Sequence, residues 1–510
     1  MNNRDYFPVN EEAFENLLHS SVPSEPPEEI VDAVTPWKKA IKRVLWGLAF
    51  NTLTLNFFYL NYILPVIGTV LSLLGLRVLR RENKYFRVYY YVAVIGTAYK
   101  WFVFALGTTV TFDEIIPETL LTILSLFFIY AQLILFCLSL YTSAKKAEIT
   151  PKKRPMVALI IWFIILTGLG LMNYTGFIIP IAMIIGFVFI IKSLNKISSE
   201  IDEVGYSIEN APVRLSDSLL SAMLIAALLV SLGCGYAFFS EHKMNWEVKE
   251  TNEHIEVQEI KDHLINLGFP EKILDDLSAD DILKCKGAQK VVVDTRQVPF
   301  NDDGHQVTYQ KQITPYFSST VTETVYLVRE MTMTGVGVCL RGEPEEDGDW
   351  MIIHHFSWDV NPGFYGTECI QIWPAYRNWR TNSFRYVDVP TGRVLYTENG
   401  IDYVSTYHSL GEENYTTDDI FGVRSNRDIF ATFSFSGKGE NHRGYVMYPV
   451  EDNKEGHSII DSWMKYNHQQ SLLQYPAETA KEYIKSGILR DSIAFREQQC
   501  ALQIAKYELM

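Results

Sequence analysis

The stretch VLWGLAFNTLTLNFFYLNYILPVIGTVLSLLGLRVL, residues 44–79, decides the fold of the amino-terminal half of the chain. A bilayer core about 30 Å thick is crossed by about 20 mostly apolar helical residues. This stretch is therefore too long for one crossing and suits two short ones. Asn61 and Pro65 lie near its middle, and proline obstructs a continuing helix. We expect a helical hairpin over 44–60 and 63–79, with the turn at these two residues.

Five further segments downstream have the length and apolar content of membrane-spanning helices. They are 88–108, 118–141, 156–172, 176–192 and 217–239. Together with the hairpin they predict a polytopic α-helical membrane domain over 44–239 with about seven transmembrane helices, for which the lipid bilayer is the first partner.

Basic residues gather on one side of this arrangement. They are Lys38, Lys39, Lys42 and Arg43 before the hairpin, Arg77, Arg80, Arg81, Lys84 and Arg87 after it, and Lys145, Lys146, Lys152, Lys153 and Arg154 between 141 and 156. The segment 109–117 holds Asp113 and Glu114 and no base. Lysine and arginine remain on the cytoplasmic side of membrane helices. We therefore expect a cytoplasmic amino terminus, an extracytoplasmic segment 240–510, and a location in the plasma membrane.

The two parts of the chain differ in charge. Residues 1–240 hold 19 Lys+Arg and 18 Asp+Glu, whereas residues 241–510 hold 26 and 42. This composition excludes a disordered protein, a wholly soluble one, and a nucleic-acid binder that works through a basic face. Residues 1–43 are acidic and proline-containing and lack the apolar core of a cleavable signal peptide, so we expect a partly disordered cytoplasmic segment there.

A helical connector is expected over 240–287. Apolar residues near a 3.6-residue period predict helix in 253–285, broken at Gly268 and Pro270. Ser278 followed three residues later by Asp281 predicts a capped short helix over 280–285.

Residues 288–450 change to short runs rich in Val, Thr, Tyr and Phe, which favour strands. The expected strands are 289–298, 306–316, 321–333, 335–341, 350–358, 367–374, 384–389, 393–397, 401–407, 429–435 and 443–448. The dipeptides Asp303-Gly304, Asp347-Gly348 and Asn399-Gly400 are typical of hairpin turns. Without alternating helices, this pattern predicts a β-rich antiparallel sandwich or jelly roll. Residues 451–510 return to helical spacing, and we expect three helices (458–473, 477–486, 490–508) packed on the sandwich.

Four cysteines fall on the expected oxidising side: Cys285, Cys339, Cys369 and Cys500. Four thiols allow three pairings, and the spacing does not choose among them. Disulfides and buried thiols both remain open, and the absence of C-x-x-C gives no support to a redox motif or zinc ribbon.

Lys100 is the ionisable residue deepest in an expected helix. Such residues often mark an ion path, but a long lysine side chain also reaches the interface by itself, helped here by Tyr99 and Trp101. We expect the second arrangement. Asn51, Asn56 and Asn61 in the hairpin are expected to form hydrogen bonds between helices.

The densest aromatic cluster outside the expected membrane segments combines rings with arginines: Trp373, Tyr376, Arg377, Trp379 and Arg380. Aromatic platforms stack on sugar rings, and arginine binds carboxylates or phosphates. A glycan or wall-polymer site is therefore one hypothesis, and a core or interface position is the other.

Metal and catalytic motifs are weak. His354 and His355 are adjacent in an expected strand, so they point to opposite faces and cannot share one metal. Acidic loops such as 345–349 do not follow calcium-loop spacing. We expect no metal and no cofactor, and Gly-x-Ser-x-Gly, His-Glu-x-x-His and phosphate-loop motifs are missing from the sequence.

Taken together, these sequence features favour an integral membrane protein with a large extracytoplasmic domain. That domain would bind or sense a ligand, a wall polymer or a protein partner. One alternative is a small-molecule or ion transporter with an accessory outer domain. Another is a membrane-anchored exported hydrolase, although no catalytic signature favours an enzyme.

Overall fold

The structure is a computed structural model of the 510-residue chain. It describes residues 36–52, 58–110, 117–150, 152–172, 174, 176, 178–204, 211–250, 255–300, 304–314, 317–326, 330–340, 349–373, 384–386, 388–419, 422–452, 459–472, 475–486 and 494–505. The chain forms two compact units. One comprises Met1–Ala105 with Asp113–Leu232, and the other comprises Leu106–Phe112 with Gly233–Met510. We call them the helical unit and the β-rich unit.

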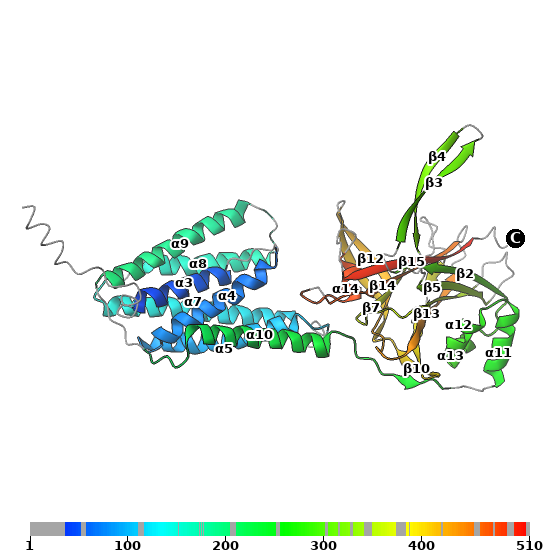
Figure 1. Cartoon of the computed structure of the whole chain (residues 1–510), viewed down its shortest axis with the longest axis horizontal. Helices are drawn as coiled ribbons and strands as arrows, with labels where there is room; N and C mark the ends of the chain where they lie inside the picture. The colour runs from blue at the N-terminus through cyan, green and yellow to red at the C-terminus, as the bar shows by residue number, and fades with distance from the viewer. Residues whose placement is uncertain are drawn as a thin grey trace, which may run out of the picture. The chain divides into compact units, whose positions relative to one another are not determined.

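Long helices make up the described part of the helical unit (Figure 1). They are α3 (Pro36–Thr52), α4 (Leu60–Leu79), α5 (Lys84–Leu106), α7 (Glu118–Lys146), α8 (Lys153–Leu171), α9 (Ile178–Glu203) and α10 (Asp217–Phe239), of which the last turns of α10 belong to the β-rich unit. Each overlaps an expected helix, but α3 begins at Pro36 and shares only 44–52 with the expected helix over 44–60. Residues 36–43 are therefore helical and not part of the expected amino-terminal segment.

Five of these helices, α4, α7, α8, α9 and α10, are long and apolar enough to cross a membrane. Their outward side chains are also apolar: Phe127 on α7 is 62% exposed and Phe189 on α9 is 66% exposed. Helices that are apolar all round fit lipid contact. The expected number of about seven spans is not established, because α3 has 17 residues with four bases and α5 contains three bases and five tyrosines.

The turn between α3 and α4 lies earlier than expected. The chain reverses before Leu60, where Phe58 and Tyr59 adopt left-handed φ values of 49° and 57°. Asn61 and Pro65 consequently lie inside α4. The two helices approach closely because small residues meet: a Cβ atom on Gly47 would collide with Ser72, and one on Gly75 would collide with the Ala40 carbonyl.

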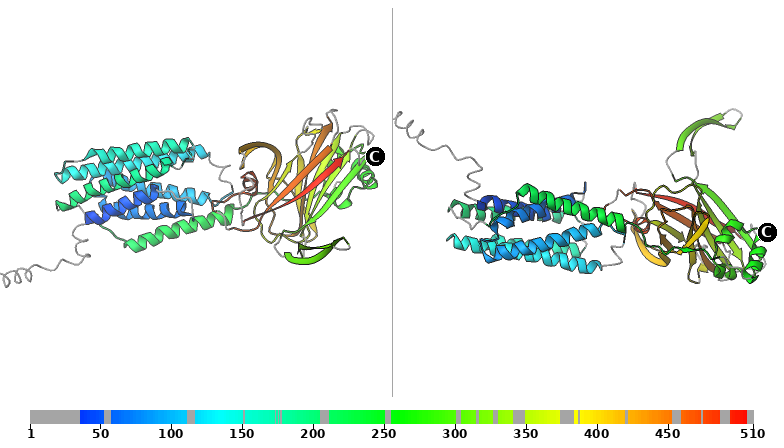
Figure 2. Two further views of the ribbon diagram at one scale, coloured as in Figure 1. Left: turned by 90° about the horizontal axis from the view of Figure 1, so that it is seen from above. Right: turned by 60° about the horizontal axis from the view of Figure 1, so that its bottom comes forward.

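The β-rich unit contains two open antiparallel sheets and a separate hairpin (Figure 1). The larger sheet has the order β1-β10-β9-β13-β6-β5-β2, with β8 paired to β13, and the smaller has the order β11-β12-β7-β14-β15. The strands are β1 (Glu247–Val248), β2 (Lys290–Val298), β3 (Gly304–Thr314), β4 (Phe317–Tyr326), β5 (Met331–Cys339), β6 (Trp350–Trp358), β7 (Glu368–Trp373), β8 (Phe384–Tyr386), β9 (Thr391–Glu398), β10 (Ile401–Thr406), β11 (Ser409–Asp419), β12 (Gly422–Phe433), β13 (Glu440–Asp452), β14 (Ile459–Gln469) and β15 (Phe495–Ala505). Strands β3 and β4 pair only with each other and stand apart from the sheets in both views of Figure 2.

One hydrophobic core lies between the two sheets. The larger sheet contributes Ile352 and Phe356 on β6, and the smaller contributes Ile370 on β7 and Phe433 on β12, all completely buried. This shared core makes the unit a two-layered sandwich, as the succession of short strands without alternating helices predicts. The expected turn at Asn399-Gly400 is present, with φ values of 53° and 76°.

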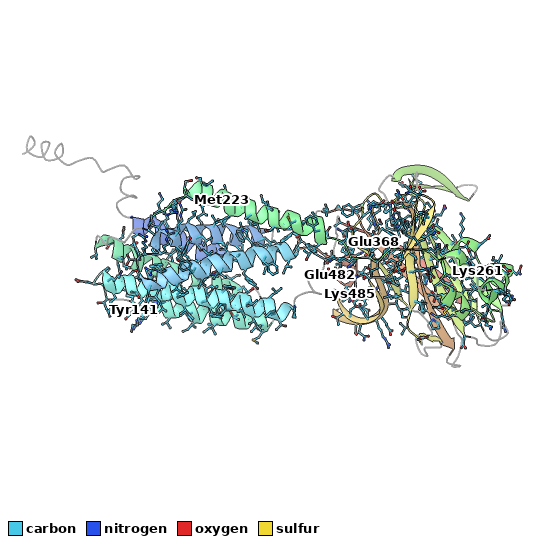
Figure 3. All side chains as sticks on the ribbon, turned by 90° about the horizontal axis from the view of Figure 1, so that it is seen from below. Tyr141, Met223, Lys261, Glu368, Glu482 and Lys485 are labelled. Carbon is cyan, nitrogen blue, oxygen red and sulfur yellow. The ribbon has the colours of Figure 1, made fainter. Side chains whose placement is uncertain are left out.

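Short helices cover the outer face of the larger sheet. These are α11 (Ile255–Asn266), α12 (Glu271–Asp276) and α13 (Ala279–Lys284), and a second core joins them to the sheet. The break at Gly268 and the Ser278 cap are as expected: the Ser278 hydroxyl accepts from the Asp281 backbone N–H at 3.2 Å. The segment is therefore a layer of the β-rich unit and not merely a connector. In Figure 3, Lys261 marks α11, and Glu368 lies between it and the residues Glu482 and Lys485 of α14 (Ala480–Lys485).

The expected carboxy-terminal helices are mostly wrong. Among the residues of this stretch that the structure describes, only α14 (Ala480–Lys485) is helical, whereas 459–469 and 495–505 form the paired strands β14 and β15. On β14 the even positions Ile460, Met464 and Tyr466 face the sandwich core, while Asn467 donates to the Ala480 carbonyl of α14 at 2.8 Å. Because apolar groups lie on both sides of these strands, their spacing resembles a helical period. The sandwich therefore extends beyond the expected limit at 450.

Candidate functional site

A buried ionic network joins α12 to the larger sheet. The carboxylate of Asp276, at the end of α12, accepts from Arg443 Nε at 2.8 Å and lies 3.0 Å from His355 Nε2. Arg443 Nη2 donates to Asp402 Oδ2 on β10 at 2.9 Å. Both Asp276 and Arg443 are buried, so the network holds α12 in a fixed position on the sheet. We call this network of four side chains the charged wall.

The network sets the ionisation of its members. Burial alone would raise the pKa of Asp276, but its hydrogen bonds to and electrostatic interactions with His355 and Arg443 outweigh burial and lower that pKa. Burial likewise opposes the charge of Arg443, yet Asp276 and Asp402 raise its pKa. Both groups are therefore charged at neutral pH.

A second carboxylate, Asp281, lies at the start of α13. It accepts from the Tyr445 hydroxyl at 2.6 Å, from Thr391 at 2.7 Å and from Lys284 at 2.9 Å. Burial would raise its pKa, but these hydrogen bonds lower it. The two carboxylates thus fix α12 and α13 onto β9 and β13.

An open cleft of about 830 Å³ lies beside this wall, between β1, β9 and β10 on one side and α11 to α13 on the other. Its charged lining consists of Glu247, Glu250, Asp275, Asp280 and Asp402 with Lys249, Lys261 and Arg393. Two of the lysines are paired within the cleft, Lys261 with Asp275 at 3.0 Å and Lys249 with Asp402 at 3.4 Å. Arg393 donates to the backbone carbonyls of Asp276 and Leu277. The lining therefore carries an excess of negative charge.

Sequence reasoning did not identify this cleft. Its residues come from segments more than 100 positions apart, and the one local signal is the run of acids at Asp275, Asp276, Asp280 and Asp281 around the Ser278 cap. Charged residues near a helix cap are common on protein surfaces, so that signal by itself indicates no site.

The predicted aromatic cluster is described only in part. Trp373 is half-buried at the end of β7, opposite Trp463 on β14, and Lys465 Nζ lies 5.6 Å from the centroid of the Trp373 ring. Tyr376, Arg377, Trp379 and Arg380 lie outside the described residues.

The four cysteines of the β-rich unit are all described and buried, and no disulfide joins any two of them. Cys285 lies in the core under α11 to α13, Cys339 and Cys500 lie in the sandwich core, and Cys369 lies under α14. Burial raises the pKa of the Cys285 thiol to about 12, which disfavours the reactive thiolate.

His354 and His355 point to opposite faces of β6, as strand geometry predicts. His354 Nε2 lies 2.6 Å from Ser462 Oγ, which is also 2.6 Å from the Tyr448 hydroxyl. All three side chains are buried in the sandwich core, so this serine–histidine contact is inaccessible to a substrate. Within the described residues, no cluster of three or more His, Cys, Asp or Glu side chains is placed to hold a metal ion.

The polar residues of the helical unit lie between helices. Lys100 Nζ donates to Asn51 Oδ1 at 2.5 Å and to Thr69 Oγ1 at 3.0 Å. Lys100 therefore contacts polar groups that α3 and α4 supply, and its expected reach to the membrane interface stays a prediction. Asn61 is half-buried near the start of α4, and Asn56 lies outside the described residues.

Comparisons with known proteins give little to add. No family model and no curated protein matches the sequence. Among solved structures, the chain is similar to Clostridium perfringens delta-toxin, with 9% sequence identity, a TM-score of 0.17, and coverage of 42% of this chain and 95% of that chain.

Proposed function

We propose that this protein is a multi-pass plasma-membrane protein whose β-rich unit faces the outside of the cell and binds a polar ligand there. Five apolar helices support membrane insertion. The collection of lysine and arginine in the segments around Lys39, Arg80 and Lys153 supports a cytoplasmic amino terminus.

The observation that carries the binding proposal is the cleft between β10 and the α11–α13 layer. Its volume suits a small ligand, and its charged wall is held rigid by the buried Asp276–Arg443 ion pair. Glu250 and Asp280 are exposed on its rim. Since acids outnumber bases in the lining, we propose a ligand that carries amino groups.

Orientation is tested with a protease added to intact cells. Cleavage within 240–510 while the amino-terminal segment is retained would support the proposal. Complete protection of the β-rich unit, with a reporter after Met510 active only in the cytosol, would refute it.

The ligand class is tested by calorimetry on the full-length protein in detergent, with spermidine as the probe and triethylene glycol as a neutral probe. We expect saturable binding of spermidine only. The pair Glu250→Gln with Asp280→Asn should weaken it at least tenfold, whereas Glu259→Gln on the outside of α11 should not. Equal binding of both probes, or an unchanged affinity in the double variant, would refute an amine site.

A glycan site is the second candidate, and the pairing of Trp373 with Trp463 across β7 and β14 favours it. Two half-buried indoles on one sheet face form a platform of the kind that stacks on sugar rings, and we propose that Tyr376, Arg377, Trp379 and Arg380 extend it. A glycan array with the full-length protein tests this candidate. Bound glycans should be lost in Trp373→Ala with Trp463→Ala, and no bound glycan at all would refute it.

A further inference from the structure

A cation is enclosed between helices of the helical unit. The ammonium of Lys100 on α5 donates to Asn51 Oδ1 of α3 at 2.5 Å and to Thr69 Oγ1 of α4 at 3.0 Å. Thr69 in turn donates to Asn51 Oδ1 at 3.1 Å, and Asn51 Nδ2 donates to the Gly47 carbonyl at 2.8 Å. Three helices therefore hold the lysine head in one position.

Both partners of Lys100 are neutral. Among the described residues no carboxylate forms an ion pair with it. An ammonium has three N–H donors, and the two hydrogen bonds use two of them. Lys100 is half-buried among largely apolar side chains. A cation that is partly withdrawn from water is costly unless a negative charge compensates it, so this position favours an anion beside Nζ.

Room for such an anion is present. Lys100 lines a cavity of about 290 Å³, near the lower limit of about 300 Å³ for small-molecule sites. Polar groups in its wall include Thr52, Ser125 and Gln132. The remaining wall is largely apolar and contains Leu48, Tyr89, Phe104, Phe128 and Phe163. The cavity thus combines one positive charge with aromatic walls.

We propose that this cavity binds a small monocarboxylate with a short apolar or aromatic body. The carboxylate accepts a hydrogen bond from Lys100 Nζ, and the body packs against Phe104 and Phe128. A charge-assisted hydrogen bond beside a largely apolar wall supplies orientation and selectivity for the anion. This site is separate from the binding proposed for the β-rich unit.

Equilibrium dialysis of the full-length protein in detergent tests the proposal, with radiolabelled benzoate as the probe and benzyl alcohol as a neutral probe of similar shape. We expect one saturable benzoate site and at least tenfold weaker binding of benzyl alcohol. No saturable benzoate binding, or equal affinity for the two probes, would overturn the proposal.

Variants locate the site. Lys100→Met should reduce benzoate affinity at least tenfold, to the level of benzyl alcohol. Lys84→Met is the matched control, because Lys84 is on the same helix but its Nζ lies over the Tyr85 ring at 5.0 Å and it does not line the cavity. Lys84→Met should bind benzoate as the wild type does. Benzoate affinity unchanged in Lys100→Met, or reduced equally in both variants, would contradict the assignment.

A second variant keeps the test decisive if Lys100→Met does not fold. Asn51→Asp places a carboxylate beside Lys100 and should pair with it internally, so benzoate binding should be lost while the protein elutes and unfolds as the wild type does. Wild-type benzoate affinity in Asn51→Asp would show that the Lys100 charge does not bind the ligand.

Discussion

Arg443 Nε lies 2.8 Å from Asp276 Oδ1, and the two residues are 167 positions apart in the chain. Arg443 is on β13 and Asp276 ends α12, so this contact fastens the helical layer to the larger sheet. Leu274 of α12 and Met447 of β13 belong to one hydrophobic core, which also holds the helical layer on the sheet. The cleft beside β10 exists because this ion pair and these contacts hold α12 in place.

Removing one partner of this pair should destabilise the β-rich unit. Arg443→Met leaves the Asp276 carboxylate buried without its cation, and the expected loss in the free energy of unfolding is about 3–5 kcal/mol. The measurement is urea unfolding of the full-length protein in detergent, followed by tryptophan fluorescence. The double variant Asp276→Leu with Arg443→Met should lose much less than the sum of the two single variants. Strict additivity would show that the two charges do not stabilise each other.

His354 should make the β-rich unit less stable in mild acid. Burial lowers the pKa of His354 from 6.5 to about 3, so the unfolded state binds a proton between these values and the folded state does not. Stability is then greatest above pH 6.5 and falls as the pH decreases, by up to about 1.4 kcal/mol per pH unit.

The variant His354→Gln should therefore show a shallower decline of unfolding free energy between pH 6 and pH 4 than the wild type. Ser462→Ala is the control, because it removes the hydroxyl that contacts His354 and keeps the imidazole. It should retain the wild-type slope even if its stability is lower. Equal slopes in the wild type and His354→Gln would contradict a buried neutral histidine.

Two glycines with positive φ should differ in their tolerance of alanine. Gly400 has φ 76° with open space around it, whereas Gly392 has φ 156° and a Cβ there would overlap the Tyr445 carbonyl oxygen. Gly400→Ala should cost about 1–2 kcal/mol for the left-handed conformation. Gly392→Ala should cost clearly more, because the obstructing atom is backbone in the paired strand β13. Comparison of the two urea midpoints checks this order, and similar midpoints would refute the close approach.

Reducing agent should leave the β-rich unit unchanged. The structure joins none of Cys285, Cys339, Cys369 and Cys500 by a disulfide. We therefore predict the same thermal unfolding midpoint with and without dithiothreitol. Mass spectrometry after alkylation in non-reducing denaturant should find every cysteine modified. A pair protected from alkylation would show that a disulfide forms and would contradict the prediction.

Elements whose pattern is local can be predicted from the amino-acid sequence. Apolar runs of sufficient length predict helices such as α10 at Asp217–Phe239, a short run of strand-favouring residues predicts β6 at Trp350–Trp358, and Ser278 and Asn399-Gly400 predict a cap and a turn. Each of these depends on neighbours within a few positions, so no distant contact is needed to recognise them.

The assignment of β14 and β15 as strands and the pairing of distant residues depend on the tertiary structure. The sequences of β14 and β15 resemble helices because both faces of these strands are packed. Asn467 and Phe495 contact α14 on one face. Met464 and Cys500 contact the sandwich core on the other face. The pairing of Asp276 with Arg443, and of Lys100 with Asn51, likewise depends on which elements lie side by side. Charge and hydrogen bonding act over a few ångströms in space, whereas a sequence records only separation along the chain.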